Sequence, residues 1–363
     1  MHFLIFGLTV SSSWGNGHAT LWRGLLKAMS RRGHTAVFYE RDVPYYSNTR
    51  DVWERPKGMR VELYQSLSEI QADVNREIAS ADVALVTSYC PDGPAAARLI
   101  LDSTVQLRIF YDLDTPITLD CLHTGKAVAY LPAEGLSEFD LVLSYTGGRA
   151  LLELQTQLAA RAAVPLYGWV DPETHAPILG DDEMRSALSY MGTYAQDRQA
   201  ALEELFVAPA HLLPADRFVI GGTQYPEDFP WGENIFFVRH LPPAMHPTFF
   251  CSSRATLNVT RRAMAEYGFC PSGRLFEAAA CGVPLLSDTW EGLDSFFVPG
   301  EEILSVKTRF DVLDALSLSN RELRMVAEAA RVRTLEHHTA QRRVLELESI
   351  CEKALSGELS RGA

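Results

Sequence analysis

Residues 270–284 form the segment of this sequence best suited to binding a phosphate. Ser272 is suited to cap a helix, which would leave backbone N–H groups near Gly273 and Arg274 available to an anion. The forked guanidinium of Arg274 matches phosphate oxygens. Glu277 follows Gly273 by one helical turn, which would place its carboxylate near ribose hydroxyls. The alternative is a structural helix with an Arg–Glu pair on its surface.

A second segment rich in small residues, 11–18, lies between the first predicted strand and the first predicted helix. Its small residues let a ligand approach the backbone, and the start of the helix favours an anion or a sugar hydroxyl. A dinucleotide-binding loop with Glu40 on the ribose is a rival interpretation, but Thr20 stands where that motif has its third glycine. The other alternative is a structural turn, with His18 as a loop histidine whose hydrogen bonds are satisfied within the protein.

Asp112 and Asp114 follow a predicted strand and are candidates for the general base that activates an acceptor hydroxyl. Asp114 is our first choice and Asp112 the second, and His18 is the third candidate for a catalytic role. The alternative for Asp114 is a capped turn before Pro116. The same Asp-x-Asp spacing occurs in metal-dependent transferases of another fold. We expect no metal, because no second acidic cluster accompanies the pair.

Short apolar runs alternate with helical patterns along most of the chain, which predicts parallel sheets covered by helices on both faces. The expected strands are residues 3–6, 35–39, 61–64, 83–87, 107–111, 141–144, 164–167, 187–191, 218–220, 235–238, 256–259, 283–287 and 303–306. The expected helices include residues 21–29, 95–101, 150–162, 198–206 and 274–281.

The pattern lapses around residues 169–182, so we expect two doubly wound α/β domains, 1–170 and 171–338. The tail is helical from about residue 320 with a break near residues 337–339, where His337 and His338 are expected to be solvated. Its last helix, about 339–363, is expected to pack back on the first domain. Open parallel sheets bind ligands outside the carboxyl ends of their strands, which predicts a site in a cleft between the domains.

The composition excludes several functional classes. Of 363 residues, 47% are hydrophobic and 22% charged, as in ordinary globular proteins. The net charge of −13 makes nucleic-acid or membrane-surface binding unlikely, because such a field repels phosphates. The six cysteines form no C-x-x-C pair, and no apolar run is long enough for a membrane span, so we expect a cytoplasmic protein with reduced thiols.

Several segments together resemble a known family: residues 114–116, 170–175, 190–194, 197–198, 257–261, 271–278, 286–288 and 299–304. The sequence resembles the spore-maturation CgeB-type glycosyltransferases of the GT-B superfamily. The resemblance covers nearly the whole chain and implies two Rossmann-like domains facing a central cleft. It further implies an acceptor site mostly in the first domain and a nucleotide-sugar site mostly in the second.

The resemblance also implies roles for individual residues. The residues expected to bind the acceptor are Trp14, Gly15, Asn16 and Gly17. The residues expected to bind the donor are Gly192, Thr193, Arg198, His240, Leu241, Asn258, Arg261, Ser272, Gly273, Arg274 and Glu277. Glu277 matches the second glutamate of a paired motif in retaining members, and Phe269 stands in place of the first. Retaining and inverting outcomes therefore both stay open.

We expect a metal-independent glycosyltransferase that moves a sugar from a nucleotide diphosphate, a UDP-sugar first of all, to an unidentified acceptor. No cofactor is expected, because the nucleotide sugar is a co-substrate. Two alternatives remain open: a nucleotide-sugar 2-epimerase of similar fold, and a catalytically inactive module that binds sugar nucleotides.

Overall fold

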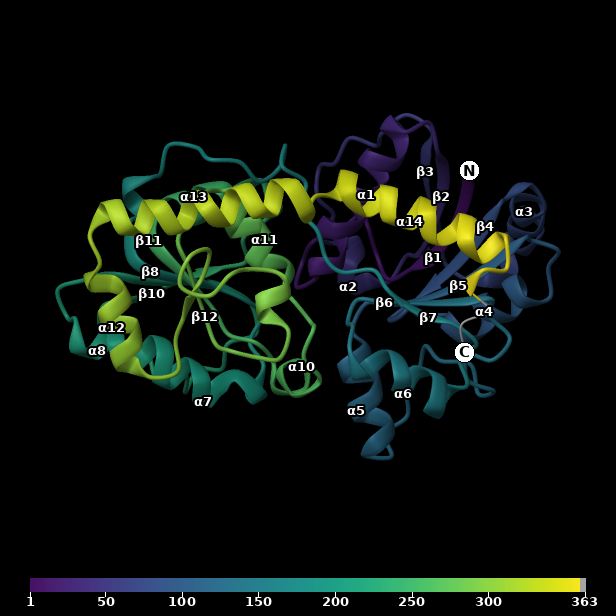
Figure 1. Ribbon diagram of the computed structural model, residues 1–363. Coiled ribbons are helices and arrows are strands. Elements are labelled where there is room, and N and C mark those ends of the chain that lie inside the picture. Colours follow the sequence, from purple (N-terminus) through teal and green to yellow (C-terminus); the bar gives the residue numbers. More distant parts are fainter. Residues whose placement is uncertain (360–363) are drawn as a thin grey trace. The chain divides into compact units, whose positions relative to one another are not determined.

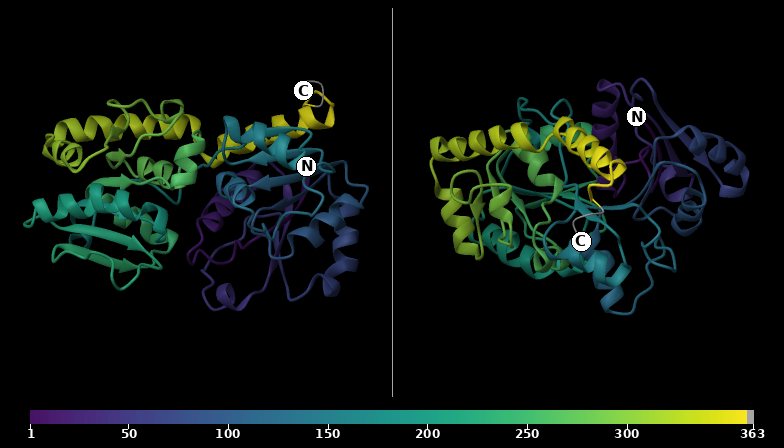
Figure 2. Two further views of the ribbon diagram at one scale, coloured as in Figure 1. Left: turned by 90° about the horizontal axis from the view of Figure 1, so that it is seen from below. Right: turned by 45° about the vertical axis from the view of Figure 1, so that its right-hand side comes forward.

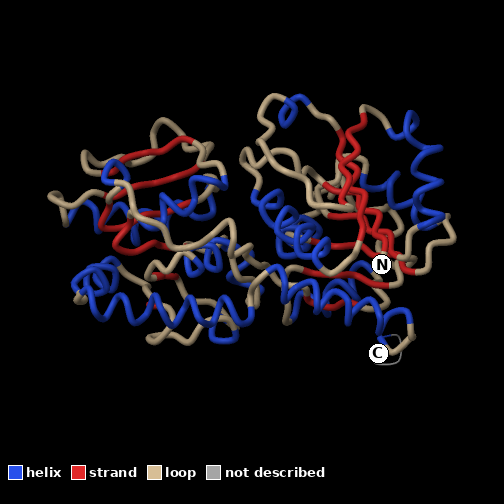
Figure 3. Tube along the Cα trace, turned by 90° about the horizontal axis from the view of Figure 1, so that it is seen from above, coloured by secondary structure: helices blue, strands red, loops and turns tan. Residues whose placement is uncertain are grey.

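The computed structural model describes residues 1–359, which fold into two compact units (Figure 1). Unit 1 contains Met1–Tyr167 and the described chain from Ala340 onwards, and unit 2 contains Gly168–Thr339. Each unit is built around one parallel sheet with helices packed against it (Figure 3). The predicted fold class, two Rossmann-like α/β domains, is confirmed.

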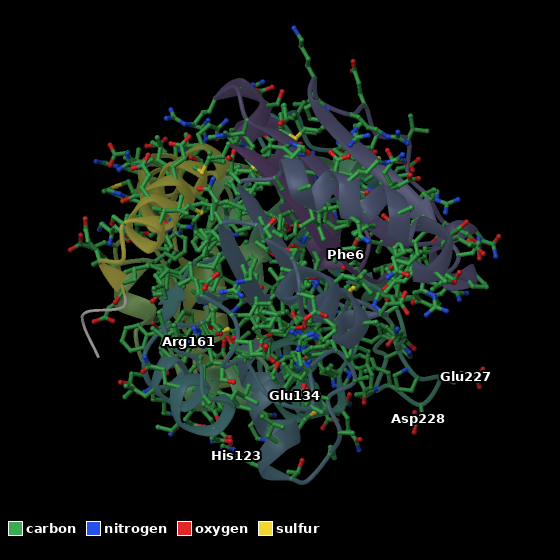
Figure 4. All side chains as sticks on the ribbon, turned by 90° about the vertical axis from the view of Figure 1, so that its right-hand side faces the viewer. Phe6, His123, Glu134, Arg161, Glu227 and Asp228 are labelled. Atoms are coloured by element: carbon green, nitrogen blue, oxygen red, sulfur yellow. The ribbon has the colours of Figure 1, made fainter. Side chains whose placement is uncertain are left out.

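The sheet of unit 1 has the strand order β3-β2-β1-β4-β5-β6-β7, and every neighbouring pair is parallel. The strands are β1 (His2–Gly7), β2 (Thr35–Arg41), β3 (Met59–Tyr64), β4 (Val83–Thr87), β5 (Leu107–Asp112), β6 (Leu141–Ser144) and β7 (Ala163–Pro165). The central strands are continuous apolar runs because helices cover both faces of the sheet. In Figure 4, Phe6 of β1 lies inside the unit, whereas His123 lies at its periphery.

Six helices of unit 1 connect its successive strands: α1 (Gly17–Arg31), α2 (Pro44–Ser47), α3 (Leu67–Ser80), α4 (Gly93–Leu101), α5 (Thr115–His123) and α6 (Arg149–Leu158). A further helix, α14 (Ala340–Leu355), joins the unit from beyond unit 2. The helix α14 runs beside α1 (Figures 1 and 2). Leu347 of α14 lines a small apolar cavity with Trp22 and Leu25 of α1 and Tyr111 of β5. The last described helix therefore belongs to the core of the first unit.

The sheet of unit 2 has the order β10-β9-β8-β11-β12-β13 and is also parallel throughout. The strands are β8 (Ser186–Met191), β9 (Phe218–Gly222), β10 (Ile235–Arg239), β11 (Ser253–Asn258), β12 (Leu285–Ser287) and β13 (Leu304–Ser305). The helices are α7 (Gln199–Leu202), α8 (Ala208–Leu212), α9 (His246–Cys251), α10 (Arg262–Tyr267), α11 (Gly273–Ala280), α12 (Arg309–Ser317) and α13 (Asn320–His337). Short 3-10 turns complete the unit: η1 (Asp182–Met184), η2 (Gln196–Arg198), η4 (Pro243–Met245) and η5 (Leu293–Ser295).

Three expectations about elements are wrong in detail. The helix predicted over 150–162 ends at Leu158, because Ala159 adopts a left-handed conformation with φ 56°. The helix predicted over 198–206 is a chain of short pieces: η2, α7, a π-helical turn η3 (Glu203–Val207), and α8. His338 is buried rather than solvated, with its ring stacked on Phe276 at 4.5 Å between centroids.

No helix among the described residues has the length and apolar character needed to cross a membrane.

Candidate functional site

The carboxyl ends of the strands of unit 2 bring most of the predicted donor residues to one edge of the sheet, because all six strands are parallel. Gly192 and Thr193 follow β8, His240 and Leu241 follow β10, and Asn258 ends β11. The helix α11 connects β11 to the parallel strand β12, so its amino end lies on the same side. The edge is the ligand-binding edge of an open α/β sheet.

The amino end of α11 has the features of an anion site. Ser272 is the N-cap residue, and its Oγ accepts a hydrogen bond from the backbone N of Arg274 at 3.4 Å. The first turn contains no acidic residue, so nothing on the helix neutralises its positive end. The Arg274 side chain forms no ion pair and no hydrogen bond within the described residues. An unneutralised helix end beside a free cation favours a bound phosphate.

Arg198 and two tyrosines add further unsatisfied polar atoms after β8 and β9. Arg198 donates through Nη2 to the carbonyl of Thr193, while its Nε is buried without a partner. The hydroxyls of Tyr190 and Tyr225 are also buried without partners. Burial raises the pKa of Tyr225 and Tyr190 raises it further, whereas Arg198 and Arg274 lower it, so both arginines lie near this phenol. Buried donors without acceptors are costly unless a ligand satisfies them.

Two glycines allow the exits of β8 and β9 to approach closely. A Cβ atom on Gly222 would lie 2.0 Å from the carbonyl oxygen of Gly192. A Cβ atom on Gly192 would lie 2.8 Å from the Tyr190 hydroxyl. On the far side of β9, the backbone N of His240 donates to the Gly222 carbonyl at 2.8 Å, with His240 at a positive φ of 54°. No larger side chain fits at Gly222 without moving the backbone.

Two predicted donor residues are engaged with the protein itself. The Nδ2 of Asn258 donates to the hydroxyls of Ser287 at 3.0 Å and Thr260 at 3.2 Å. The Nε of Arg261 donates to Asp197 at 3.4 Å. The side chains of Asn258 and Arg261 therefore stabilise the loops at this edge of the sheet. The side chains of Arg274 and Arg198 still have N–H donors available to a ligand.

Glu277 lies at the centre of a buried cluster of three titratable side chains, with His175 and His246. Its carboxylate oxygens are 4.0 Å from His175 Nε2 and 3.7 Å from His246 Nδ1, and those two nitrogens are 3.1 Å apart. Burial alone would raise the pKa of Glu277, but the two histidines and Arg274 together lower it. Burial lowers the pKa of His175, and it lowers that of His246 to about 4, although Glu277 opposes both changes. The cluster is thus one carboxylate beside two neutral imidazoles.

This cluster is also where the described residues could hold a metal ion. No other group of three metal-ligating side chains this close occurs in residues 1–359. Asp112 and Asp114, with the Asp-x-Asp spacing, lie in unit 1 and belong to no such group.

In unit 1, the amino end of α1 brings His18 to within 3.9 Å of Asp114, measured from Nε2 to Oδ2. Asn16 is the N-cap residue of α1, and its Oδ1 accepts a hydrogen bond from the backbone N of His18 at 3.0 Å. Burial lowers the pKa of His18, and Asp114 opposes this change. The separation exceeds hydrogen-bond distance, so the carboxylate acts on the imidazole through its charge, and a neutral imidazole beside a carboxylate can serve as a general base.

Asp112 and Tyr89 lie beside this pair. The Oδ1 of Asp112 accepts from the backbone N of Asp114 at 3.1 Å, while its Oδ2 is buried without a partner. Burial raises the pKa of Asp112 to about 6. Tyr89 has a φ of 63°, which is rare for an aromatic residue, and its ring lies 5.7 Å from that of His18. Such outliers are common at functional sites.

The predicted acceptor loop, which contains Trp14, Gly15, Asn16 and Gly17, is held in place by two acidic side chains, the buried Glu40 and the partly buried Asp51. Glu40 accepts from the backbone N of Val10 at 2.8 Å and of Ser11 at 3.0 Å. Asp51 accepts from the backbone N of Ser13 at 2.8 Å. Glu40 is therefore occupied with the loop, and the structure does not favour the rival interpretation in which it binds a ribose.

Local sequence patterns do not indicate His246, Tyr89 or Tyr225 as site residues, and His175 and Tyr190 occur only within the segments that resemble the family. His175 and His246 meet across 71 positions of sequence. Two signals were present: His175 follows the end of the first half by a few residues, and His246 begins a short helix after two prolines. Neither signal fixes a partner.

One protein family matches part of the chain. Residues 198–349 match a protein family described as glycosyl transferase-like. No curated protein matches the sequence.

Solved structures match the whole chain at low identity. Sucrose-phosphate synthase from Thermosynechococcus elongatus has a TM-score of 0.73 at 13% identity, over 98% of this chain and 100% of that chain. Anabaena HepE in complex with UDP and glucose has a TM-score of 0.67 at 12% identity, over 96% and 100%. An α-glucosyltransferase in complex with UDP-glucose and DNA containing an abasic site has a TM-score of 0.68 at 12% identity, over 97% and 100%.

At these identities the structural matches show the fold alone. The family match covers the region that contains α11. The chain therefore has the GT-B fold of these glycosyltransferases, and its residues 198–349 match the glycosyl transferase-like family.

Proposed function

We propose that this protein is a glycosyltransferase that transfers a sugar from a UDP-sugar to an acceptor hydroxyl. The observation that carries the proposal is the group of free donors in unit 2: the amino end of α11, the unpaired side chain of Arg274, and the buried Nε of Arg198. A diphosphate supplies the negative charge and the acceptor oxygens that these groups lack. The resemblance to CgeB-type enzymes is consistent with the same function.

UDP is the proposed nucleotide because structural neighbours of the same fold hold UDP or UDP-glucose. When the bond between the sugar and the diphosphate breaks, negative charge develops on the leaving phosphate. Arg198, Arg274 and the dipole of α11 are placed to stabilise that charge. A metal ion on the phosphates is not needed for this step.

The acceptor side of the reaction is proposed to lie in unit 1. His18 is the candidate base that removes the proton of the acceptor hydroxyl, and the charge of Asp114, 3.9 Å away, stabilises the imidazolium formed. The loop from Trp14 to Gly17 is the proposed acceptor-binding segment. Direct proton removal by Asp114 or Asp112 is the alternative, and it predicts that His18→Gln keeps most of its activity.

Calorimetry with UDP tests the donor site. We expect Arg274→Ala and Arg198→Ala each to weaken UDP binding by about 10- to 100-fold, because a charge-assisted hydrogen bond contributes about 1.5–3 kcal/mol. The matched control is Arg262→Ala, whose side chain is 73% exposed in the same unit. UDP affinity within twofold of the wild type in Arg274→Ala would contradict the proposed site.

Incubation of the wild type with UDP-sugars alone separates transfer from epimerisation. A transferase leaves the sugar configuration unchanged in the absence of an acceptor, apart from slow hydrolysis. Accumulation of a 2-epimer in proton NMR spectra would overturn the proposed function.

A further inference from the structure

The cluster of His175, His246 and Glu277 is not needed for the phosphate site, and three separate segments of unit 2 contribute to it. His175 lies in the turn after Asp171, His246 begins α9, and Glu277 is on α11. The side chain of His175 is 0% exposed, and those of His246 and Glu277 are 11% and 9% exposed. A buried cluster of this kind is costly unless its charge and lone pairs are satisfied.

The carboxylate of Glu277 has no hydrogen-bond donor within the described residues. Its nearest neighbours are the two imidazole nitrogens, at 3.7 and 4.0 Å, which are beyond hydrogen-bond distance. Arg274 lies near enough to lower the pKa of Glu277 but forms no hydrogen bond with it. An ionised carboxylate with this degree of burial is therefore left with unsatisfied acceptor sites.

The hydrogen bonds of His246 determine which of its nitrogens faces the cluster as an acceptor. Its Nε2 is 3.1 Å from the carbonyl oxygen of Leu241, and a carbonyl oxygen is only an acceptor, so the proton lies on Nε2. The lone pair is then on Nδ1, which faces Glu277 and accepts a hydrogen bond from His175 Nε2 at 3.1 Å. Metal binding would require this His175 proton to move to Nδ1, which is buried without a partner. A backbone carbonyl that fixes the tautomer of a ligating histidine is a common feature of metal sites.

The distances within the cluster are close to those around a tetrahedral metal ion. Ligand atoms about 2.1 Å from a tetrahedral ion lie about 3.4 Å from one another. The two imidazole nitrogens are 3.1 Å apart, and they lie 3.7 and 4.0 Å from different oxygens of Glu277. With one ligand atom taken from each residue, all three atoms lie within 4.8 Å of one another, so a small movement of the side chains would close them around an ion. Two imidazole nitrogens and one carboxylate oxygen form a donor set that suits Zn²⁺ and does not suit Mg²⁺ or Ca²⁺.

From this geometry we propose that His175, His246 and Glu277 bind one divalent transition-metal ion, Zn²⁺ first of all. The ion neutralises the buried carboxylate of Glu277. It links three segments: the turn that contains His175, the helix α9 and the helix α11. It lies one helical turn behind the phosphate-binding end of α11, so its role is to position that helix. The inference is independent of the nature of the sugar donor. The ion would compete with the ribose of the donor for the carboxylate of Glu277.

The test measures metal content and metal affinity. The protein is purified without a metal-affinity tag, and its metals are measured by mass spectrometry. A chelator then removes them, and Zn²⁺ is titrated back by calorimetry. We expect one Zn²⁺ per chain in the wild type, and a melting temperature that falls on metal removal and recovers on its return.

Two conservative variants and one control locate the ion. His246→Gln keeps a donor near Leu241, and Glu277→Gln keeps the shape of the side chain; each is expected to weaken Zn²⁺ binding by at least 100-fold. His211→Gln, an exposed histidine on α8 of the same unit, is expected to bind as the wild type does. Circular dichroism establishes that the variants are folded. Arg274→Ala should lose UDP and keep Zn²⁺, which separates this inference from the proposed function.

Two outcomes would overturn the proposed metal site. The first is a wild type that contains no metal and takes up no Zn²⁺ in the titration; if Glu277→Gln then also loses UDP affinity, the carboxylate binds the ribose. The second is Zn²⁺ binding that stays within threefold of the wild type in both His246→Gln and Glu277→Gln, which would place any bound metal elsewhere in the chain.

Discussion

At the scale of single residues, Asp112 shows how burial changes the properties of a carboxyl group. Its folded-state pKa of about 6 is above the usual value of 3.8, so the folded protein holds this proton more tightly than the unfolded chain. Stability is therefore lost as the pH rises from about 4 to about 6, by at most about 3 kcal/mol. The ionised Asp112 carboxylate therefore destabilises the folded protein at neutral pH. It lies beside the pair of His18 and Asp114.

Asp112→Asn should remove this pH dependence. We expect the variant to gain about 1–3 kcal/mol over the wild type when the pH changes from 4 to 7.5, because an amide does not ionise. Urea denaturation at both pH values measures it, with the exposed Glu134→Gln of the same unit as control (Figure 4). An equal stability difference at the two pH values would show that the carboxyl titrates normally.

His18→Gln should lower kcat by about 10²- to 10⁴-fold, the usual contribution of a general base, with little change in UDP affinity. Because burial lowers the pKa of His18, the neutral base should persist at neutral pH, and the rate should decline only as the pH falls below 6.5. His123→Gln, an exposed histidine of the same unit, is the control. Transfer assays over pH 4.5–8 measure both effects, and a kcat within threefold of the wild type would exclude His18 as the base.

At the scale of helices and strands, the cap of α1 positions His18. Asn16→Ala should destabilise the protein by about 1 kcal/mol, because Asn16 satisfies the backbone N of His18. Ser66→Ala is the matched control, since Ser66 occupies the N-cap of α3 but its hydroxyl caps no backbone N–H and contacts the Ser68 hydroxyl at 3.0 Å. Denaturant midpoints compare the two, and similar losses would mean that the Asn16 cap contributes nothing specific.

The close approach of β8 and β9 makes Gly222 a sensitive position. Gly222→Ala should lower the melting temperature markedly, because its Cβ would lie 2.0 Å from the Gly192 carbonyl oxygen, and should weaken UDP binding as the loops move. Gly17→Ala should leave the melting temperature unchanged or slightly raised, because nothing lies within 4 Å of its Cβ. Differential scanning fluorimetry measures both; a stable Gly222→Ala would show that the loops adjust freely.

The sequence was sufficient for elements that local patterns determine. The strand β1, the start of α11 with its Ser272 cap, and the loop before α1 follow from apolar runs, small residues and cap preferences. The end of the sixth helix was misjudged because Ala159, which adopts the left-handed conformation there, gives no stop signal. The cluster around Glu277 was not predictable, because local patterns carry no information about contacts between distant segments.

At the scale of the whole molecule, unit 1 depends on a helix from the far end of the described chain. Val344, Leu347 and Cys351 of α14 are buried in its core. Leu347→Ala should therefore destabilise the protein by about 2–4 kcal/mol, as expected for a buried leucine. Leu345→Ala, on the exposed side of the same helix, should cost less than about 0.5 kcal/mol. Urea denaturation measures the two, and equal effects would contradict the packing of α14.

The chain enters unit 2 at Gly168 and returns to unit 1 at Ala340, so one unit is inserted within the other. During translation, all of unit 2 leaves the ribosome before α14 is available to complete unit 1. The apolar surface around Trp22 and Leu25 then lacks the cover of Leu347 throughout that interval. We therefore expect truncated nascent chains that stop before residue 340 to be recognised as unfinished, even though their second half has already folded.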